Sequence, residues 1–348
     1  MRILIVTRNL VGYGGIPYSL VNLANGKYKI KDHENKIVYL ILENKKIDKK
    51  LIEIIVKYEV SLIYKKNILS KIFFLLKNYM KFDVILTTCF RSFVLSKIFS
   101  LFSQKVILWL RGANIIVSPL KRFIFNIFNN NIVIANSRYT GLANGLTEDK
   151  FMILYNGISK RFLKMNISNF HKHFQIPKNA YVISYIGGWS KIKNHKLLLK
   201  AFNKLGYKYK NLYLLLIGEI SDLTRTLVSE IEENLKKRVI IRDKENFASK
   251  YLRYINLYVH PCYAEGFGNV IIEAIFAGKP VLGAKAGALP EILENRFLFN
   301  PFNEKDLITK IEYFFKYKKL NKSFSKKVLK KYSVENFYQN FIDILSNI

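Results

Sequence analysis

Short apolar runs alternate with longer segments of helical period along most of the chain. In the first half, these runs are residues 2–7, 36–42, 82–88, 105–110 and 131–136. In the second half, they are residues 181–188, 212–218, 238–242 and 257–261. Runs of this length, rich in Ile, Val and Leu, are typical of buried strands, and helices between them are typical of parallel crossover connections. The pattern therefore predicts an α/β fold with parallel sheets.

One stretch interrupts this alternation and divides the chain into two similar halves. Residues 161–178 are mostly polar and follow neither period, and 348 residues exceed what one hydrophobic core usually serves. We therefore predict an N-terminal Rossmann-like domain at 1–160, an interdomain connection at 161–178 and a C-terminal Rossmann-like domain at 179–330. The last segment, 331–348, is predicted as a helix that can pack back toward the N-terminal domain. Ligands bind beyond the carboxyl ends of parallel strands, so two facing sheets suggest a substrate in an interdomain cleft.

The segment EGFGNVIIEAIFAG, residues 265–278, carries two glutamates in contrasting settings. Glu265 precedes a Gly-Phe-Gly turn, whereas Glu273 lies in an otherwise apolar helix with Asn269 as its expected N-cap and Gly278 as its stop. A buried carboxylate is costly unless it accepts strong hydrogen bonds, which the two hydroxyls of a ribose can supply. Backbone amides of the glycine turn, at the helix N-terminus, favour a phosphate. The alternative is that Glu273 pairs with a Lys or Arg and that the glycines only form a turn.

This segment, with AGKPVLG and AGALPEIL after it, resembles the glutamate-x7-glutamate region of retaining GT-B glycosyltransferases of family 4, the glycosyl transferases group 1 type. The resemblance extends, more weakly, along nearly the whole chain. It implies the GT-B fold, in which two facing Rossmann-like parallel-sheet domains form an interdomain cleft. It also implies that the N-terminal domain binds the acceptor and that the C-terminal domain binds a nucleotide diphosphate sugar, with no metal and no further cofactor.

The resemblance also assigns positively charged residues. In YIGGWSKIKNHKLLLKAF, Lys193 falls on a family lysine that grips the donor diphosphate, while Gly188 stands where the family has an arginine. Lys191 or Arg111 can substitute for that arginine. Arg111, in VILWLRGANIIVSP, also takes the place of a family histidine, so no general base is carried over, and a structural role for Arg111 is an equal alternative. Because the chain has no Asp-x-Asp motif, fixed positive charge is expected to stabilise the leaving diphosphate.

The N-terminal segment RNLVGYGGIPYSLVNLAN places Gly14 and Gly15 between a strand and a helix, which resembles the family's diglycine loop. A dinucleotide-binding fingerprint is the competing interpretation, but Pro17 stands in place of its third glycine. Asp243 and Glu245 match the family region beside the nucleotide base. The predicted catalytic residues are Glu265, Lys193 and Arg111. The predicted donor-binding residues are Gly14, Gly15, Gly187, Gly188, Lys191, Lys193, Asp243, Glu245, Glu265, Gly266, Phe267, Gly268, Asn269, Val270 and Glu273.

The net charge indicates which kind of binding partner to expect, and the cysteine content indicates which cellular compartment to expect. The chain has 57 Lys and Arg against 25 Asp and Glu, a formal net charge of +32, which favours a polyanionic partner. The excess is spread along the chain, whereas a nucleic-acid arm would concentrate it, so no nucleic acid is expected and most lysines are interpreted as solvated surface. Two cysteines form no disulfide framework, the first residues read as a strand, and no apolar run reaches the roughly 20 residues that span a bilayer. We therefore expect a cytoplasmic protein.

The apolar and basic residues of 62–82 have the spacing of a basic amphipathic helix. This pattern gives a prediction about where the acceptor lies. Such a helix suits an anionic membrane surface, although packing on the domain's own sheet is its more common use. The apolar residues of this face are Ile68, Ile72, Leu75 and Leu76, and the basic ones around it are Lys65, Lys66, Lys71 and Lys77. With the net charge, the pattern favours a glycan or lipid-linked glycan acceptor at the inner face of the cell membrane, to which the protein could bind peripherally.

Together with the residue patterns, the resemblance implies a retaining, metal-independent glycosyltransferase that moves a sugar from a nucleotide diphosphate sugar to a growing cell-surface glycan. Lipopolysaccharide, capsule and lipid-linked oligosaccharide are the candidate products. Another GT-B activity, an epimerase or a phosphorylase, is one alternative, but the histidine, carboxylate or lysine-bound cofactor that it needs has no convincing position. A basic nucleic-acid-binding protein is the alternative from another class, and it predicts steeply salt-dependent binding with indifference to nucleotide sugars.

Overall fold

The described residues of the computed structural model form two compact units. Unit 1 comprises Met1–Ser159 together with Tyr332–Ile348, and unit 2 comprises Lys160–Lys331. Residues 161–178, predicted as an interdomain connection, fall within unit 2, where the buried ring of Phe170 stacks on Tyr254. The structure describes residues 1–348 apart from 9–14, 43–48, 65–72, 75–76, 100–104, 114, 117, 129–130, 166, 168 and 318–321.

Unit 1 is an α/β unit on a parallel sheet. Its strands are β1 (Arg2–Thr7), β2 (Lys36–Ile41), β3 (Ser61–Tyr64), β4 (Val84–Thr87), β5 (Lys105–Leu110), β6 (Ile132–Ala135) and β7 (Met152–Ile153). Its helices are α1 (Gly15–Ile30), α2 (Lys49–Lys57), α4 (Phe90–Phe99), α5 (Pro119–Ile127), α6 (Arg138–Ala143) and α13 (Val334–Ser346). The strand order is β3-β2-β1-β4-β5-β6-β7, with every pair parallel. The central strands are buried on both faces, as parallel sheets usually are.

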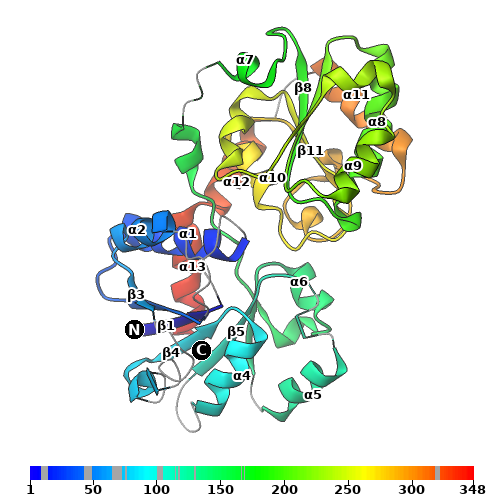
Figure 1. Cartoon of the computed structure of the whole chain (residues 1–348). Coiled ribbons are helices and arrows are strands. Elements are labelled where there is room, and N and C mark those ends of the chain that lie inside the picture. The colour runs from blue at the N-terminus through cyan, green and yellow to red at the C-terminus, as the bar shows by residue number, and fades with distance from the viewer. Residues whose placement is uncertain are drawn as a thin grey trace. The chain divides into compact units, whose positions relative to one another are not determined.

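The C-terminal helix α13 packs against α1, although the two helices come from opposite ends of the chain (Figure 1). A Cβ on Gly26 of α1 would lie 2.3 Å from the carbonyl oxygen of Val334 and 2.6 Å from the Cβ of Tyr338. The missing side chain at Gly26 therefore allows the two helices to approach closely. The ring of Trp109 in β5 packs against Phe337 of α13, with centroids 6.2 Å apart. These contacts make the C-terminal residues part of the core of unit 1.

Unit 2 is a second α/β unit on its own parallel sheet. Its strands are β8 (Tyr181–Ile186), β9 (Leu212–Ile217), β10 (Val239–Arg242), β11 (Leu257–His260), β12 (Val281–Ala284) and β13 (Leu298–Phe299). Its helices are α7 (Phe170–Phe174), α8 (His195–Lys208), α9 (Asp222–Ser229), α10 (Asn269–Phe276), α11 (Glu304–Tyr317) and α12 (Lys322–Lys331), with 3-10 turns that include η4 (Lys191–Lys193) and η6 (Ala248–Tyr254). The strand order β10-β9-β8-β11-β12-β13 is that of a Rossmann fold. Helices α8 and α9 lie on one side of this sheet and α10 on the other (Figure 1).

The prediction of two Rossmann-like parallel-sheet domains is confirmed, and each predicted strand overlaps an observed one. The strands β3, β7, β12 and β13 were missing from the prediction. β7 and β13 hold two residues each, too few to establish a period. β3 and β12 hold four, as do some of the predicted strands, but β3 overlaps the stretch interpreted as a helix and β12 lies in the segment AGKPVLG, which was interpreted only as part of the motif. The helix predicted over residues 62–82 is wrong at its start, where Ser61–Tyr64 pairs with β2. Most of that amphipathic face lies outside the described residues, including Lys65, Lys66, Ile68, Lys71, Ile72, Leu75 and Leu76.

Membrane-spanning segments were searched for among the described residues. None of the helices there combines the length and the apolar character needed to cross a bilayer.

Candidate active site

The candidate site lies where the strand order of unit 2 reverses. β8 and β11 are hydrogen-bonded neighbours, but the chain continues from β8 to β9 on one side and from β11 to β12 on the other. In an open parallel sheet this reversal leaves a crevice beyond the carboxyl ends of the two strands, where ligands bind. Lys193 follows β8 and Glu265 follows β11. The topology therefore brings together two of the three predicted catalytic residues.

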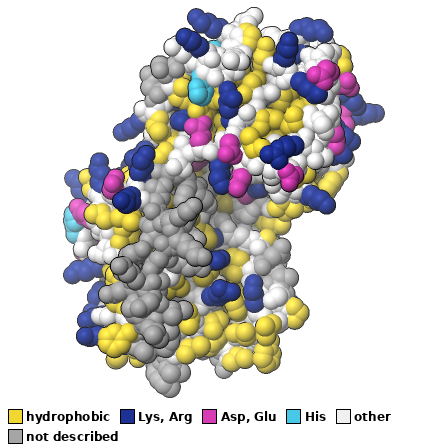
Figure 2. All heavy atoms as spheres, viewed as in Figure 1, with side chains coloured by type: hydrophobic (Ala, Val, Ile, Leu, Met, Phe, Trp, Pro, Cys, Tyr) yellow, Lys and Arg dark blue, Asp and Glu magenta, His cyan; other side chains and the backbone are white. Residues whose placement is uncertain are grey.

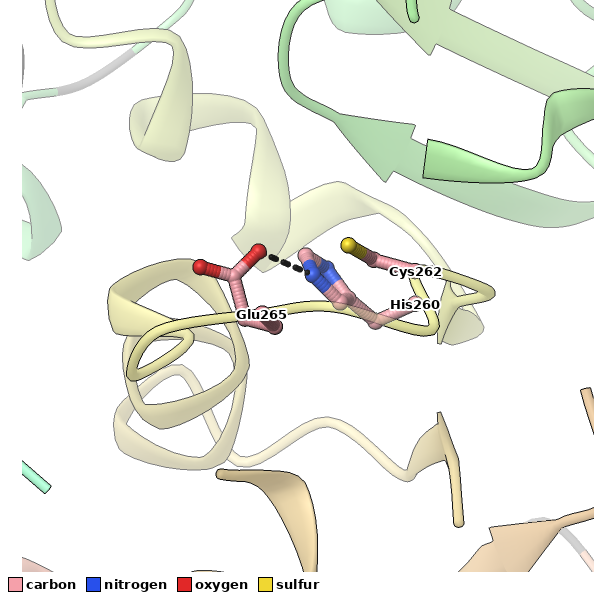
Figure 3. A group of neighbouring side chains, drawn as sticks. All are labelled: His260, Cys262 and Glu265. Atoms are coloured by element: carbon pink, nitrogen blue, oxygen red, sulfur yellow. Dashed lines mark hydrogen bonds and ion pairs between the residues drawn. The ribbon is translucent and has the colours of Figure 1, made fainter. Parts of the chain in front are cut away.

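Glu265 is held between a lysine and a histidine. Its Oε2 lies 2.7 Å from Lys193 Nζ. The same oxygen lies 2.9 Å from His260 Nε2 (Figure 3). Burial raises the pKa of Glu265, but the His260 hydrogen bond and the Lys193 charge outweigh it and hold that pKa well below its usual range. Burial lowers the pKa of Lys193, but the charge of Glu265 outweighs this effect and the net change is upward. At neutral pH the two groups therefore form an ion pair, with 24% of the Lys193 side chain and 17% of the Glu265 side chain exposed.

His260, the last residue of β11, fixes the position of the Glu265 carboxylate. Burial lowers the pKa of this histidine, although Glu265 opposes the shift, so the ring is neutral at neutral pH. Its Nδ1 lies 3.1 Å from the Tyr258 hydroxyl, which also lies 3.3 Å from the carbonyl oxygen of Ile186. A neutral ring satisfies both neighbours when Nε2–H donates to Glu265 and Nδ1 accepts from Tyr258. The histidine thus links the carboxylate to the buried end of the sheet.

Cys262 completes the surroundings of the Lys193 ammonium. Its thiol is fully buried and hydrogen-bonds Lys193, and burial raises its pKa, so the thiol is protonated at neutral pH. His260, Cys262 and Glu265 lie on one stretch of chain that begins at the end of β11 (Figure 3). In the part of the chain that the structure describes, the metal-binding atoms of these three side chains all lie within 4.8 Å of one another. The site therefore contains three different potential metal donors beside a lysine.

The loop that carries Glu265 is braced by the segment AGALPEIL. The Ala288 amide donates to the Glu265 carbonyl oxygen at 2.9 Å, and a Cβ on Gly287 would lie 2.6 Å from that oxygen. Gly268 has φ +92° and occupies the N-cap position of α10, so Asn269 is the first helical residue and not the N-cap that we predicted. A left-handed backbone favours glycine, because a Cβ is strained there. The shape of this loop thus depends on glycines at 268 and 287.

Glu273 lies inside α10 and is 4% exposed. The Ser249 hydroxyl of η6 donates to Glu273 Oε2 at 2.6 Å. The helix around Glu273 is buried and apolar, as the sequence predicted. The carboxylate therefore has a hydroxyl donor of the kind that a ribose could also provide. Gly266, Phe267 and Val270, the other predicted residues of this segment, lie between the two glutamates.

The loop after β8 begins with two glycines that differ in their surroundings. A Cβ on Gly187 would lie 2.5 Å from the Tyr185 hydroxyl, whereas a Cβ on Gly188 would meet no atom within 4 Å. The position at which the resemblance implies an arginine is thus open to a side chain. Lys191, the first residue of η4, is exposed.

An aromatic stack supports the same loop. The rings of Trp189 and His195 are stacked with centroids 4.0 Å apart, and His195 meets the ring of Tyr185 edge-on at 4.6 Å. Burial, reinforced by His260 and Lys193, lowers the pKa of His195 to about 3. His195 is therefore neutral at neutral pH, and it supports the loop without adding a charge beside Lys193.

Asp243 and Glu245 follow β10, and both are engaged in local contacts. Asp243 Oδ1 accepts hydrogen bonds from the backbone amides of Ile220 at 3.1 Å and Lys244 at 2.8 Å, and these bonds lower its pKa. Glu245 forms an ion pair with Lys250 at 2.8 Å. The two carboxylates thus stabilise the loop after β10. Their predicted position beside a nucleotide base stays a hypothesis.

Two predicted residues of unit 1 lie next to each other. Arg111 Nη2 donates to the Ser19 hydroxyl and lies 3.4 Å from the carbonyl oxygen of Gly15, while its guanidinium packs 4.4 Å from the centroid of the Trp109 ring. Burial lowers the pKa of Arg111 to about 9, so the group is protonated at neutral pH. Its Nε and Nη1 have no hydrogen-bond partner among the described residues. Arg111 therefore fastens the start of α1 and retains two unused donors, while Gly14 lies outside the described residues.

Sequence reasoning missed several residues of the site. His260 and Cys262 precede Glu265 in the stretch HPCYAE, and three metal-binding residue types within six positions are a signal that could have found them. Tyr258 alternates with His260 along β11, a weaker signal. Ser249 gave no signal, because its contact with Glu273 crosses 24 positions of sequence.

Comparison with known proteins finds a family model that matches the part of the chain carrying this site. Residues 166–331 match the family of glycosyl transferases group 1. The chain is 25% identical over 143 residues to N-acetyl-alpha-D-glucosaminyl L-malate synthase of Bacillus anthracis, covering 41% of this chain and 37% of that protein. It is 27% identical over 188 residues to the N-acetylgalactosamine-N,N'-diacetylbacillosaminyl-diphospho-undecaprenol 4-alpha-N-acetylgalactosaminyltransferase of Campylobacter jejuni, covering 52% of this chain and 49% of that protein. The chain thus spans less than two thirds of the length of these relatives.

The similarity in fold covers the whole chain. The crystal structure of HepE of Anabaena in complex with UDP-glucose aligns over 100% of both chains, with a TM-score of 0.79 and 20% sequence identity. At this identity the likeness concerns the fold, and it confirms the predicted GT-B architecture.

Proposed function

Because residues 166–331 match the glycosyl transferases group 1 family and the chain has the GT-B fold, we propose that this protein transfers a sugar from a nucleotide diphosphate sugar to a growing cell-surface glycan. We propose that transfer retains the anomeric configuration of the donor sugar and needs no divalent metal. The ion pair of Lys193 with Glu265 at the switch point of unit 2 carries this proposal.

The roles follow from what each group of the pair can bind. The Glu265 carboxylate accepts hydrogen bonds, so it is suited to hold hydroxyls of the donor sugar. The Lys193 ammonium is a compact positive charge suited to the donor diphosphate, on which negative charge develops as the sugar leaves. In the proposed reaction the acceptor oxygen bonds to the anomeric carbon on the side of the departing diphosphate. The diphosphate oxygen takes the acceptor's proton, which makes a separate general base unnecessary.

Fixed charge supports the proposed independence from metal. Lys193 lies beside the loop that leads into the N-terminus of α10, where backbone amides and the helix dipole also favour an anion. In unit 1, the two unused donors of Arg111 suit a further phosphate contact, so we propose Arg111 as a second group that stabilises the leaving diphosphate.

The rest of the nucleotide is proposed to lie along α10. Glu273 already accepts from one hydroxyl, that of Ser249, and ribose hydroxyls offer the same chemistry. Glu273 is therefore assigned to the ribose. The residues between the glutamates, together with Gly187 and Gly188, are assigned to the diphosphate.

The acceptor is proposed to be a glycan or a lipid-linked glycan at an anionic membrane surface. The Campylobacter jejuni relative is named for transfer to a diphospho-undecaprenol-linked sugar. In this chain, α5 exposes Leu120, Phe123 and Ile127 by 69%, 65% and 60%, at a spacing that places them on one helical face. Apolar side chains gather at this end of unit 1 (Figure 2). Lys121 and Arg122 lie beside them in the sequence, and this combination suits the interface of an anionic bilayer.

A thermal-shift panel of nucleotide diphosphate sugars tests the proposal directly. A donor that binds only the folded state raises the melting temperature, and at 100 times its Kd it contributes about 2.7 kcal/mol. We expect one nucleotide base to give the shift and the matching donor to be turned over, with NMR of the product showing a retained anomeric configuration. No shift with any donor, combined with steeply salt-dependent binding of nucleic acid, would instead support the nucleic-acid-binding alternative. Conversion of the donor without an acceptor would support an epimerase.

A further inference from the structure

The Lys193 ammonium lies among three donors that differ in chemistry. It is 2.7 Å from the Glu265 carboxylate and hydrogen-bonds the thiol of Cys262. His260 is within 2.9 Å of the same carboxylate oxygen. A cation therefore already lies beside a carboxylate, a thiol and an imidazole, all of them largely buried.

These donors match the ligand preferences of zinc. Zinc in proteins binds Cys sulfur, His nitrogen and carboxylate oxygen at about 2.0 to 2.3 Å, which places tetrahedral ligand atoms about 3.3 to 3.8 Å apart. The three atoms here lie within 4.8 Å of one another, and His260 Nε2 lies 2.9 Å from Glu265 Oε2. Shifts of about 1 Å or less would bring them to tetrahedral spacing. Magnesium and calcium prefer oxygen ligands, so a thiol and an imidazole argue against them.

The hydrogen bonds behind His260 allow it to become a metal ligand at little cost. The Tyr258 hydroxyl has two neighbours, His260 Nδ1 at 3.1 Å and the Ile186 carbonyl oxygen at 3.3 Å. If this hydroxyl turns to donate to Ile186, it can accept from Nδ1–H, and Nε2 is left with a free lone pair. A histidine that ligates a metal usually donates its other ring N–H to such a partner. The buried network therefore satisfies either tautomer.

From this geometry we propose that His260, Cys262 and Glu265 form a zinc site that is filled only when Lys193 moves away. On binding, the Cys262 thiol releases its proton to solvent and the thiolate bonds to the metal. His260 changes tautomer without losing a proton overall, and Lys193 keeps its charge as it turns outward. Three protein ligands leave a fourth position for water.

Zinc and the sugar donor would then exclude each other, a consequence that rests on the proposed function. Zinc would occupy Glu265, the proposed sugar ligand, and displace Lys193, the proposed diphosphate ligand. The site would therefore be inhibitory, and chelation would restore activity instead of abolishing it. Zinc binding itself depends only on the three ligands, so it can be tested separately.

The test measures the affinity of the full-length protein for Zn²⁺ alone, by competition with a chromophoric chelator. Wild type is expected to bind one equivalent tightly, and Cys262→Ser to bind at least about tenfold more weakly, a loss typical of disturbed metal sites. Cys89→Ser changes the other cysteine, in unit 1, and is the matched control that keeps wild-type affinity. Lys193→Ala removes the competing charge and is expected to bind zinc about tenfold more tightly.

Cys262→Ser and Lys193→Ala are expected to change zinc affinity in opposite directions, so misfolding cannot be mistaken for the proposed effect. A general loss of structure weakens binding in both Cys262→Ser and Lys193→Ala, whereas the proposal requires tighter binding in the second. Titration with Co²⁺ is expected to give a thiolate-to-cobalt charge-transfer band in wild type and Cys89→Ser that is absent in Cys262→Ser. Equal zinc affinity in wild type, Cys262→Ser and Lys193→Ala would overturn the proposal and show adventitious binding only.

A second measurement separates this site from the proposed function. Nucleoside diphosphate is expected to weaken zinc binding in wild type in proportion to its occupancy. If zinc binds as proposed but no nucleotide competes with it, the zinc site stands and the donor assignment fails. If nucleotide binds and zinc does not, the zinc site is overturned and the proposed function is unaffected.

Discussion

At the scale of single residues, the two glutamates of the motif differ in what surrounds them. Glu265 lies in an ion pair with Lys193, whereas Glu273 accepts from the Ser249 hydroxyl inside a buried helix. We expect Glu273→Ala to weaken nucleoside diphosphate binding by about tenfold or more, because a hydrogen bond to a charged group contributes about 1.5 to 3 kcal/mol. Glu265→Ala should leave that binding nearly unchanged while lowering the rate of sugar transfer. Calorimetry with the diphosphate checks both, and equal affinity in wild type and Glu273→Ala would exclude the ribose assignment.

A gain of function is expected at Gly188. A Cβ there meets no atom within 4 Å, and the resemblance implies an arginine at this position. Gly188→Arg should fold normally and bind the donor diphosphate more tightly, since a guanidinium forms paired hydrogen bonds with phosphate. The control is Gly187→Ala, whose Cβ would lie 2.5 Å from the Tyr185 hydroxyl and should lower the melting temperature. Unchanged affinity in a stable Gly188→Arg would show that the open position does not face the diphosphate.

How far the site was predictable differs from residue to residue. Glu265 and Lys193 were predicted because the motif fixes their place relative to strand ends, and parallel topology then brings the ends of β8 and β11 together. The hydrogen bond from Ser249 to Glu273 could not be predicted, because Ser249 lies in a separate 3-10 turn, η6, and contacts Glu273 only in the folded protein. The local role of Arg111 at the start of α1 also needed the structure, since strand order alone does not orient a side chain.

At the scale of elements, the start of α8 is expected to make stability depend on pH. His195, its first residue, has a pKa of about 3 in the fold against 6.5 as a free side chain. Below pH 6.5 the unfolded chain therefore binds a proton that the folded chain does not, so stability falls as pH falls. The slope from one such group approaches about 1.4 kcal/mol per pH unit. His195→Phe keeps an aromatic ring against Trp189 and should flatten the slope between pH 4.5 and 6.5.

Urea unfolding at several pH values measures this slope. His260 also has a lowered pKa, so part of the dependence should persist in the variant. Carboxylates with lowered pKa values, such as Glu265, act mainly below pH 4.5 and do not disturb the window. Parallel curves for wild type and His195→Phe would contradict the assignment of a neutral His195.

The packing of α13 on α1 gives a second prediction at this scale. A Cβ on Gly26 would overlap the backbone of Val334, so Gly26→Ala should destabilise the protein by about 1 to 3 kcal/mol, as overpacked cores do. Gly15→Ala is the matched change in the same helix, where a Cβ meets nothing within 4 Å. Thermal unfolding should show a clear loss for the first variant only. A similar melting temperature for both would mean that α13 does not approach α1 as closely as the structure shows.

Most of the strands were predictable from their apolar runs, including several of only four residues. Strands of six residues such as β1 and β8 have enough apolar positions to distinguish them from helices. β12 and β13 hold four and two residues, and their pairing with β11 and with each other sets them as strands. That pairing depends on residues distant in sequence, which no local pattern records.

At the scale of the whole molecule, we expect the positive charge and the exposed apolar side chains of α5 to act together at a membrane surface. The net charge of +32 attracts an anionic surface over about a Debye length, roughly 10 Å at 0.1 M salt and about 3 Å at 1 M. Lys and Arg side chains are visible on both units in this view (Figure 2), and the positive excess is spread along the chain, so we do not expect charge alone to orient the protein. We expect the apolar face of α5 to insert into the interface and supply that orientation.

We therefore expect binding to anionic lipid vesicles that has two separable components. Raising the salt should weaken it strongly, and vesicles of neutral lipid should bind little at any salt. Phe123→Ser should weaken binding to anionic vesicles by about tenfold at low salt, because burying a Phe side chain contributes about 1.5 to 3 kcal/mol. Val56→Ser, which changes an exposed apolar residue of α2, should have no such effect. If both variants sediment with vesicles as wild type does, charge alone accounts for the binding, and α5 has no part in bringing the protein to the proposed membrane-bound acceptor.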